Sequence, residues 1–289
     1  MRTIPLRAPA VACDAARAMG HSREAVLAVV ERSPAAVAVH DRAAWLDLFS
    51  DDAVVEDPVG SAPAPKTDGT LGRFYDTFIA PHGIRFEIRR DHFLGDDVFR
   101  DAVIHTHVRD GVDVQVEAYL LYQVADRGGA LKARRMAAHW TLARMTGLAL
   151  RLGPRAWWAM TGLFLRMIRV MGPGWVGAYL ASLWRGIGGG GRDAAERLAR
   201  AVEARDEQAL AALFAPSAEL ELGERALTPS SLLGALPPGT KLRVDAPVAA
   251  GWTTSFRFRL EGASPAEGLA LLEFDPSTRK IRRARFFPP

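Results

Sequence analysis

The sequence predicts an α+β protein that contains two copies of one fold. In the first half, segments with helical spacing of apolar residues give way near Ile84 to segments that alternate apolar and polar residues. The second half repeats part of the first. Helices followed by antiparallel strands are typical of helices packed on one face of a curved sheet. A chain of 289 residues is long enough for two such domains, each with its own core.

The internal repeat is clearest where a helix leads into a strand. Residues 40–56 align with residues 205–221 and share Asp, Ala, Leu, Phe, Ala and Glu at matching positions. Residues 132–135 and 280–283, near the last strand of each half, both read Lys-x-Arg-Arg. A repeat of this length indicates duplicated domains. The predicted division is an N-terminal arm at 1–20, a first domain at 21–141, an apolar helical linker at 142–191 and a shorter second domain at 192–289.

Three helices are expected at the start of the first domain. Ser22 and Asp41 precede apolar-periodic segments, as N-cap residues do. Pro34 lies inside the first of these segments and is expected to kink or split that helix. The expected helices cover residues 22–39, 42–49 and 69–80. The alternating segments that follow predict four strands at 84–90, 99–108, 114–124 and 131–140, with turns at 109–111 and 126–129.

An acidic motif lies between the second helix and a proline-rich loop. The run from Phe49 to Gly60 reads Phe-Ser-Asp-Asp-Ala-Val-Val-Glu-Asp-Pro-Val-Gly. Pro58 removes a backbone donor and favours extended geometry at Asp57. A carboxylate in this position can face a pocket at the end of a strand, although an Asp before Pro is also common in turns.

Together with Gly69 and the pair Phe74-Tyr75, this motif resembles the ketosteroid isomerase group of the NTF2-like (SnoaL-like) superfamily over about residues 22–141. The resemblance implies tandem NTF2-like cone folds and identifies Asp57 as the proton-shuttling base. In the repeat alignment Leu222 occupies the position of Asp57. We therefore expect the second copy to be degenerate and to lack this base.

The resemblance also assigns further residues to a site. The family's two oxyanion donors fall at Ser33 and Leu120, so both are replaced and steroid isomerase activity itself is not expected. Tyr75 matches the family's supporting tyrosine, and Trp140 matches an aromatic residue that flanks the base in some members. The predicted catalytic residues are Asp57 and Tyr75. The predicted substrate-binding residues are Trp45, Phe74, Phe78, Phe86, Leu120, Tyr122, His139 and Trp140, for which core packing is the alternative.

Composition argues against several other classes of site. Cys13 is the single cysteine, which excludes an internal disulfide and indicates a reducing, cytoplasmic location. The net charge of +4 comes from scattered arginines without interleaved aromatics, so nucleic-acid binding is not expected. His105, His107 and His139 lack carboxylates at metal-ligand spacing, so neither a metal nor a cofactor is predicted.

The segment 142–191 is unusual because it contains many tryptophans and arginines and no acidic residue. Gly153-Pro154 and Gly172-Pro173-Gly174 divide it into short helices, each too short for the roughly 20 apolar residues of a membrane span. Three interpretations remain open. In the first, the segment is a linker packed on both domains, with its arginine head groups reaching water. In the second, it is a lid over the pocket or a dimer contact. In the third, it is an interfacial hairpin that binds anionic lipid at the inner face of the membrane.

The leading functional hypothesis is a ketosteroid isomerase-like protein that binds a bulky hydrophobic molecule and uses Asp57 as general base in an isomerase or cyclase step. One alternative is a non-catalytic carrier of lipids or other hydrophobic ligands, or a membrane-surface protein. Another is an epoxide hydrolase/cyclase-like enzyme of polyketide type, because Glu87 lies near the second acid of tandem-domain cyclases that this chain resembles. Arg85 and Arg89 flank Glu87, however, and favour a surface ion-pair array. A homodimer remains open.

Overall fold

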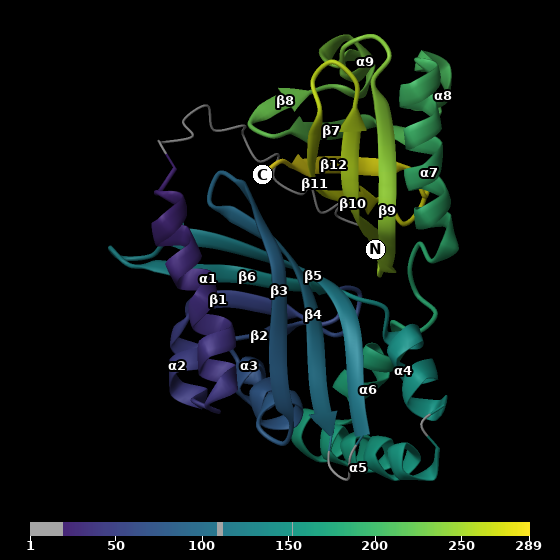
Figure 1. Cartoon of the computed structure of the whole chain (residues 1–289). Helices are drawn as coiled ribbons and strands as arrows, with labels where there is room; N and C mark the ends of the chain where they lie inside the picture. The colour runs from purple at the N-terminus through teal and green to yellow at the C-terminus, as the bar shows by residue number, and fades with distance from the viewer. Residues whose placement is uncertain (1–19, 109–111, 152) are drawn as a thin grey trace, which may run out of the picture.

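The computed structural model describes residues 20–108, 112–151 and 153–289. The turn expected at 109–111 and all but the last residue of the expected N-terminal arm lie outside these described residues. Each half of the chain forms a six-stranded sheet with helices on one face (Figure 1). The α+β class and the two copies predicted from the sequence are confirmed.

Helices at the start of the first domain begin where capping residues predict. The Ser22 hydroxyl accepts a hydrogen bond from the Ala25 N–H at 3.2 Å, and the Asp41 carboxylate accepts one from the Ala44 N–H at 2.9 Å. Of the predicted kink or split at Pro34, the split does not occur, because the first helix continues through this residue with buried residues on both sides holding it against the sheet. These helices are α1 (Arg23–Ala38), α2 (Arg42–Asp47), α3 (Thr70–Phe74) and the π-helical turn η1 (Tyr75–Ile79).

The first sheet has the strand order β2-β1-β6-β5-β4-β3. Strand β1 runs parallel to β6, and the other neighbours are antiparallel. All four predicted strands form, and β3 is longer than expected. The strands are β1 (Phe49–Glu56), β2 (Ala64–Pro65), β3 (Gly83–Leu94), β4 (Asp97–Val108), β5 (Val112–Asp126) and β6 (Leu131–His139).

The second domain repeats this order as β8-β7-β12-β11-β10-β9, again with its first long strand parallel to its last. Asp206 caps a helix as Asp41 does. Its elements are α7 (Gly189–Ala204), α8 (Glu207–Leu213), β7 (Phe214–Leu222), β8 (Arg225–Leu227), the 3-10 turn η2 (Pro229–Ser231), α9 (Leu232–Ala235), β9 (Lys241–Ala250), β10 (Thr253–Glu261), β11 (Ala266–Phe274) and β12 (Ile281–Phe287).

Three helices connect the two sheets: α4 (Leu142–Arg151), α5 (Pro154–Met171) and α6 (Pro173–Ala181). Both proline-glycine sites act as predicted, because α5 begins at Pro154 and α6 at Pro173. All three helices lie against the first domain, and α5 follows the edge of that domain farthest from the second (Figure 1). No helix among the described residues is long and apolar enough to cross a lipid bilayer.

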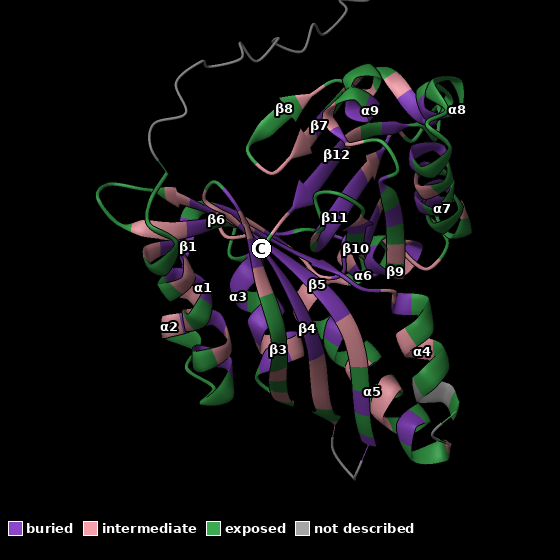
Figure 2. Cartoon of the chain, turned by 45° about the horizontal axis from the view of Figure 1, so that its top comes forward, coloured by how far each residue is buried: buried purple, intermediate pink, exposed green. Residues whose placement is uncertain are grey.

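The two sheets pack on one another through the faces that do not carry their helices. Their shared core is formed by Val59, Leu94, Phe99, Tyr119, Leu121, Ala137, Val248, Ala250, Leu269, Leu271 and Phe287. The strands that meet there are largely buried (Figure 2). Gly60 and Gly251 touch so closely that a Cβ atom on Gly60 would lie 2.4 Å from the Gly251 Cα. The helix-covered face of the first sheet therefore points away from the second domain.

Candidate functional site

An apolar cavity of about 300 Å³ lies between the helix-covered face of the first sheet and the surrounding helices. Alternate residues of β3, β4 and β5 form one wall, because successive side chains of a strand point to opposite faces. Helices α4, α5 and α6 complete the enclosure, so the segment predicted as a linker is also a wall of the cavity. Its volume is at the lower end of the range for small-molecule sites.

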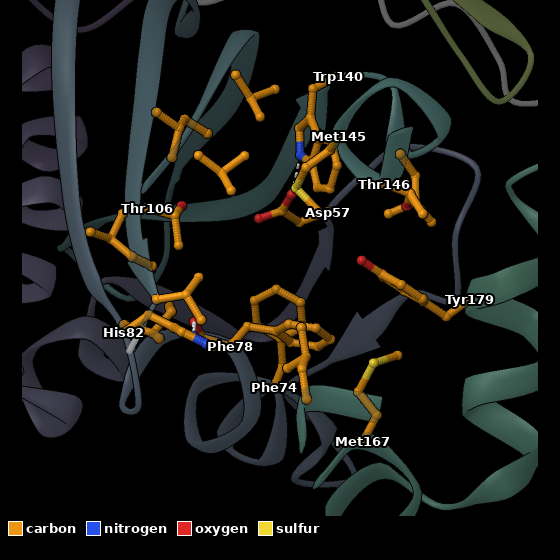
Figure 3. A pocket seen from close by; sticks show the side chains of 18 of the residues that line it. Asp57, Phe74, Phe78, His82, Thr106, Trp140, Met145, Thr146, Met167 and Tyr179 are labelled. Atoms are coloured by element: carbon orange, nitrogen blue, oxygen red, sulfur yellow. Dashed lines mark hydrogen bonds between the residues drawn. The ribbon is translucent and has the colours of Figure 1, made fainter. Parts of the chain in front are cut away.

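Asp57 is the only carboxylate among the described residues that line this cavity. It directly follows β1, in a turn that is held by the Val59 N–H donating to the Ala138 carbonyl at 2.9 Å. The peptide bond between Asp57 and Pro58 is cis. Asp57 projects from the end of β1 into largely apolar surroundings (Figure 3).

The indole of Trp140 holds this carboxylate, with Nε1–H donating to Asp57 Oδ1 at 2.5 Å. The two residues meet because β1 and β6 are parallel, with Glu56 opposite Ala137, so both strands end at the same edge of the sheet. Burial raises the pKa of Asp57 to about 6, and the hydrogen bond from Trp140 acts in the opposite direction. A carboxylate with this pKa is ionised at neutral pH and is a stronger base than an ordinary aspartate.

Tyr179 of α6 points its hydroxyl into the cavity toward Asp57 (Figure 3). Burial, and to a lesser extent the charge of Asp57, raise the pKa of the Tyr179 hydroxyl well above its ordinary value. The phenol therefore remains protonated and can donate a hydrogen bond. No sequence motif links Tyr179 to Asp57.

Ser33 and Leu120, where the family's oxyanion donors would fall, both line the cavity. Tyr122 lines it as well and shares a strand face with Leu120. Burial raises the pKa of Tyr122, and a hydrogen bond with Ser33 acts in the opposite direction. Although the family's two donors are replaced, the cavity wall still carries the phenol of Tyr122.

Eight of the predicted site residues line the cavity: Trp45, Asp57, Phe74, Phe78, Phe86, Leu120, Tyr122 and Trp140. Tyr75 is not among the lining residues. It packs against Trp45 with ring centroids 5.4 Å apart, and its buried hydroxyl has no hydrogen-bond partner among the described residues. This position does not support direct contact between Tyr75 and a ligand.

His139 is also outside the cavity, which corrects its predicted role in substrate binding. It precedes Trp140 on the chain, so the alternation of the strand directs it to the opposite face of the sheet. There its Nδ1 lies 3.0 Å from Thr253 Oγ1 of the second domain. Burial, with smaller contributions from Arg135 and Arg285, lowers the pKa of His139 to about 3. The imidazole is a neutral part of the domain interface.

Glu87 lies on the outer face of the sheet, because it alternates with the cavity residue Phe86. Its Oε2 is 3.0 Å from His105 Nε2, whereas the flanking Arg89 pairs with Glu117 at 3.1 Å. This position places no second acid beside Asp57. His107 is 2.7 Å from Asp113. Within the described part of the chain, no group of three or more His, Cys, Asp or Glu side chains could hold a metal ion.

Several lining residues belong to no motif that would identify them from the sequence. Met145, Met160 and Met167 project from α4 and α5, where their apolar periodicity is that of any packed helix. Unbranched thioether side chains adapt to ligands of different shape. His82 also lines the cavity, with Nδ1 2.8 Å from the Phe78 carbonyl oxygen, and burial lowers its pKa.

Comparison with known proteins identifies a family for part of the chain. Residues 30–147 match the family model described as a SnoaL-like domain. No curated protein matches the sequence. Similar solved structures include the Δ5-3-ketosteroid isomerase from Mycobacterium sp., with 27% identity over 40% of this chain and 92% of that chain, at a TM-score of 0.36.

Two proteins of Mycobacterium tuberculosis are similar as well. One was solved in complex with estradiol-17beta-hemisuccinate and has 26% identity over 42% of this chain and 95% of its own, at a TM-score of 0.37. The other is an LEH-like epoxide hydrolase, with 20% identity over 44% and 91% and a TM-score of 0.37. From the family match and the strand order, the first half of the chain is a SnoaL-like (NTF2-like) domain, and the second half is a second copy of that fold.

Proposed function

We propose that the first domain binds a bulky apolar small molecule and transfers a proton on it, with Asp57 as general base. The observation that carries this proposal is a single carboxylate, with a pKa raised to about 6, in a largely apolar cavity. Structural carboxylates are usually paired with cations, whereas an unpaired buried carboxylate is typical of acid–base sites. The isomerase class fits this arrangement best, because the candidate second acid, Glu87, faces the other side of the sheet.

The proposed step begins with a β,γ-unsaturated ketone, in which the carbon next to the carbonyl separates it from a carbon–carbon double bond. The Asp57 carboxylate takes a proton from the carbon next to the carbonyl, and the electron pair of the broken C–H bond forms an enolate. The protonated Asp57 then returns the proton to a different carbon of the conjugated system, and the carbonyl is restored. No redox partner is needed, because the substrate and the product are isomers.

The enolate needs a hydrogen-bond donor, and we assign this role to Tyr179. Ser33 and Leu120 stand in the positions of the family's donors, so the donor has to come from elsewhere. The Tyr179 hydroxyl faces Asp57 across the cavity (Figure 3), and its raised pKa keeps it protonated. Removal of one such donor typically costs about 3 kcal/mol of transition-state stabilisation, or 10²–10³ in rate.

The test compares the wild type with Asp57→Asn, Tyr179→Phe and a control, Asp52→Asn. Asp52 lies on the same strand, but it is exposed and pairs with Arg127 at 3.1 Å. Each protein is incubated with a β,γ-unsaturated cyclic ketone of steroid size, and conjugation is followed by ultraviolet absorbance. In deuterium oxide, NMR measures exchange at the carbon next to the carbonyl.

We expect turnover and exchange in the wild type and in Asp52→Asn, a loss of both in Asp57→Asn, and a 10²–10³-fold lower rate in Tyr179→Phe. The wild-type rate should rise with pH to a plateau above about 6, because Asp57 acts in its ionised form. Equal exchange in the wild type and in Asp57→Asn would remove Asp57 from the mechanism.

A non-catalytic carrier is the second candidate, and it is favoured by the replacement of both family donors at Ser33 and Leu120. A carrier needs the apolar walls but not the base. Binding of an apolar fluorescent probe with equal affinity by the wild type and Asp57→Asn, with no exchange in either protein, would support this candidate over the enzyme.

A further inference from the structure

Helix α5 exposes large apolar side chains, most of them on the face that does not line the cavity. Trp158 is 78% exposed, Leu165 60% and Trp157 53%. Phe164 and Ile168 are also exposed, at 39% and 36%. In an α-helix, residues seven and eleven positions apart lie on one side. Trp157, Phe164 and Ile168 therefore share a stripe with Trp158 and Leu165 beside it, and we call these five residues the α5 patch.

The opposite face of the same helix is apolar for a different reason. Ala156 and Met167 are buried, and together with Met160 and Leu163 they line the cavity. Burial against the first domain accounts for these residues but not for the α5 patch. Soluble monomers rarely expose a contiguous apolar surface of this kind unless it binds a partner or a membrane.

The charge around the patch identifies the kind of partner. Residues 142–191 contain six arginines and no aspartate or glutamate. Arg155 and Arg169 lie on α5 itself and are exposed, and Arg151 is exposed at the end of α4. Aromatic and aliphatic side chains bordered by arginines match a bilayer surface that contains anionic phospholipids, since the apolar groups enter the acyl boundary and the guanidinium groups meet phosphates.

We propose that the protein docks on anionic membranes through the α5 patch. The place of α5 in the fold permits this contact, because the helix lies along the edge of the first domain farthest from the second domain (Figure 1). Docking there leaves the second domain directed away from the bilayer.

The helix that would dock is also a wall of the cavity. Phe164 both lines the cavity and is 39% exposed, so this side chain separates the cavity from the surface that would meet the lipid. An apolar ligand dissolved in the bilayer could then reach the cavity past one side chain, without crossing water. This route rests on the proposed ligand-binding function, whereas the docking itself does not.

Co-sedimentation of the full chain with vesicles tests the proposal. One set of vesicles is phosphatidylcholine alone, and the other contains phosphatidylcholine and phosphatidylglycerol in equal amounts. The variants are Trp158→Ser/Leu165→Ser, which removes exposed apolar surface, and Arg155→Glu/Arg169→Glu, which reverses charge. Arg200→Glu is the control, because Arg200 is an exposed residue on α7 of the second domain. Circular dichroism and thermal melting confirm that each variant is folded.

We expect the wild type and Arg200→Glu to sediment with the anionic vesicles and at least tenfold less with the neutral ones. Both double variants should bind the anionic vesicles at least tenfold more weakly, since each removes two contacts of the kinds that hold a protein at an interface. On binding, tryptophan emission should shift to shorter wavelength, and brominated lipids should quench it.

Failure of the wild type to sediment with anionic vesicles would overturn the proposal, and so would equal binding by the wild type and Trp158→Ser/Leu165→Ser. Light scattering measures the oligomeric state, which tests whether a second copy of the chain occupies the patch instead of a membrane. A wild-type dimer that becomes a monomer in Trp158→Ser/Leu165→Ser would identify the α5 patch as a contact between two copies of the chain, and would refute the docking proposal. The outcome is independent of the Asp57 assay, so the two proposals can fail separately.

Discussion

Replacing Asp57 with asparagine should stabilise the protein at neutral pH. Burial raises the pKa of this carboxyl from 3.8 to about 6, so the folded state disfavours the charged form that predominates at pH 7. A shift of roughly two pKa units corresponds to about 3 kcal/mol of unfolding free energy. Asparagine has a similar shape, carries no charge, and can still accept the hydrogen bond from Trp140.

The stabilisation should depend on pH in a defined direction. Between about pH 4 and 6, the folded state holds the Asp57 proton more tightly than the unfolded state does. The contribution of the wild-type carboxyl to stability is therefore present below about pH 4 and is lost as the pH rises through about 6. Since asparagine does not titrate, the advantage of Asp57→Asn should be near zero at pH 4 and largest above pH 7.

Calorimetry or fluorescence melting of the two proteins from pH 4 to 8 measures this difference. For a chain of this size, about 3 kcal/mol raises Tm by roughly 5 °C. The control is Asp52→Asn on the same strand. Hydrogen bonds from Ser50 and Arg127 lower the pKa of Asp52, so its replacement should not stabilise the protein at any pH. A Tm difference for Asp57→Asn that is independent of pH, or negative at pH 8, would refute a strained carboxylate at this site.

Three further predictions concern the partner of Asp57 and the domain interface. Trp140→Phe removes the indole donor and should raise the pKa of Asp57 above 6, which NMR titration of the labelled carboxyl would detect; an unchanged value would contradict the hydrogen bond. Arg257→Ala removes the hydrogen bonds of 2.6 and 3.1 Å that Arg257 donates to the buried Asp101. The free energy of unfolding, measured by denaturant titration, should fall by about 3 kcal/mol. A fall no larger than that caused by Arg259→Ala, at an exposed neighbour, would contradict this prediction. Because the folded-state pKa of His139 is depressed to about 3, its neutral form contributes stability that is lost as pH falls below about 6.5, by about 2 kcal/mol at pH 5. His139→Asn should flatten that loss, and an unchanged slope would assign it to other groups.

The fold was predictable because local signals agreed with the long-range pattern. Asp41 and Asp206 cap equivalent helices, and the strand alternation set the faces of Phe86 and Tyr122 correctly. Pro34 misled the prediction because propensity describes an isolated helix, whereas packing on the sheet holds this one. His139 misled it for another reason: the alternation that directs Trp140 into the cavity directs His139 to the opposite face of the sheet, which the second sheet buries.

The candidate site was predictable only in part. Asp57 and Trp140 lie at the ends of neighbouring parallel strands, and the motif and the resemblance indicated both. Tyr179 lies 122 residues after Asp57 on a helix outside the matched residues 30–147. Its position depends on how α4, α5 and α6 fold back over the sheet. No spacing rule connects residues that meet only through such packing.

The comparison of the two copies separates the requirements of the fold from those of the site. Glu56 pairs with Arg135 at the end of β1, and Glu221 pairs with Arg283 at the same place in β7, at hydrogen-bond distances of 2.8 and 2.9 Å. The fold retains this pair in both halves. The next residue differs between the copies. It is Asp57 in the first copy and Leu222 in the second, where the leucine packs against an apolar core. A buried carboxylate costs stability wherever it lies, and leucine at the same position does not. The acid is present in the copy where a cavity and Tyr179 face it, as the proposed role of Asp57 as a base requires, whereas a purely structural role would not distinguish the two copies.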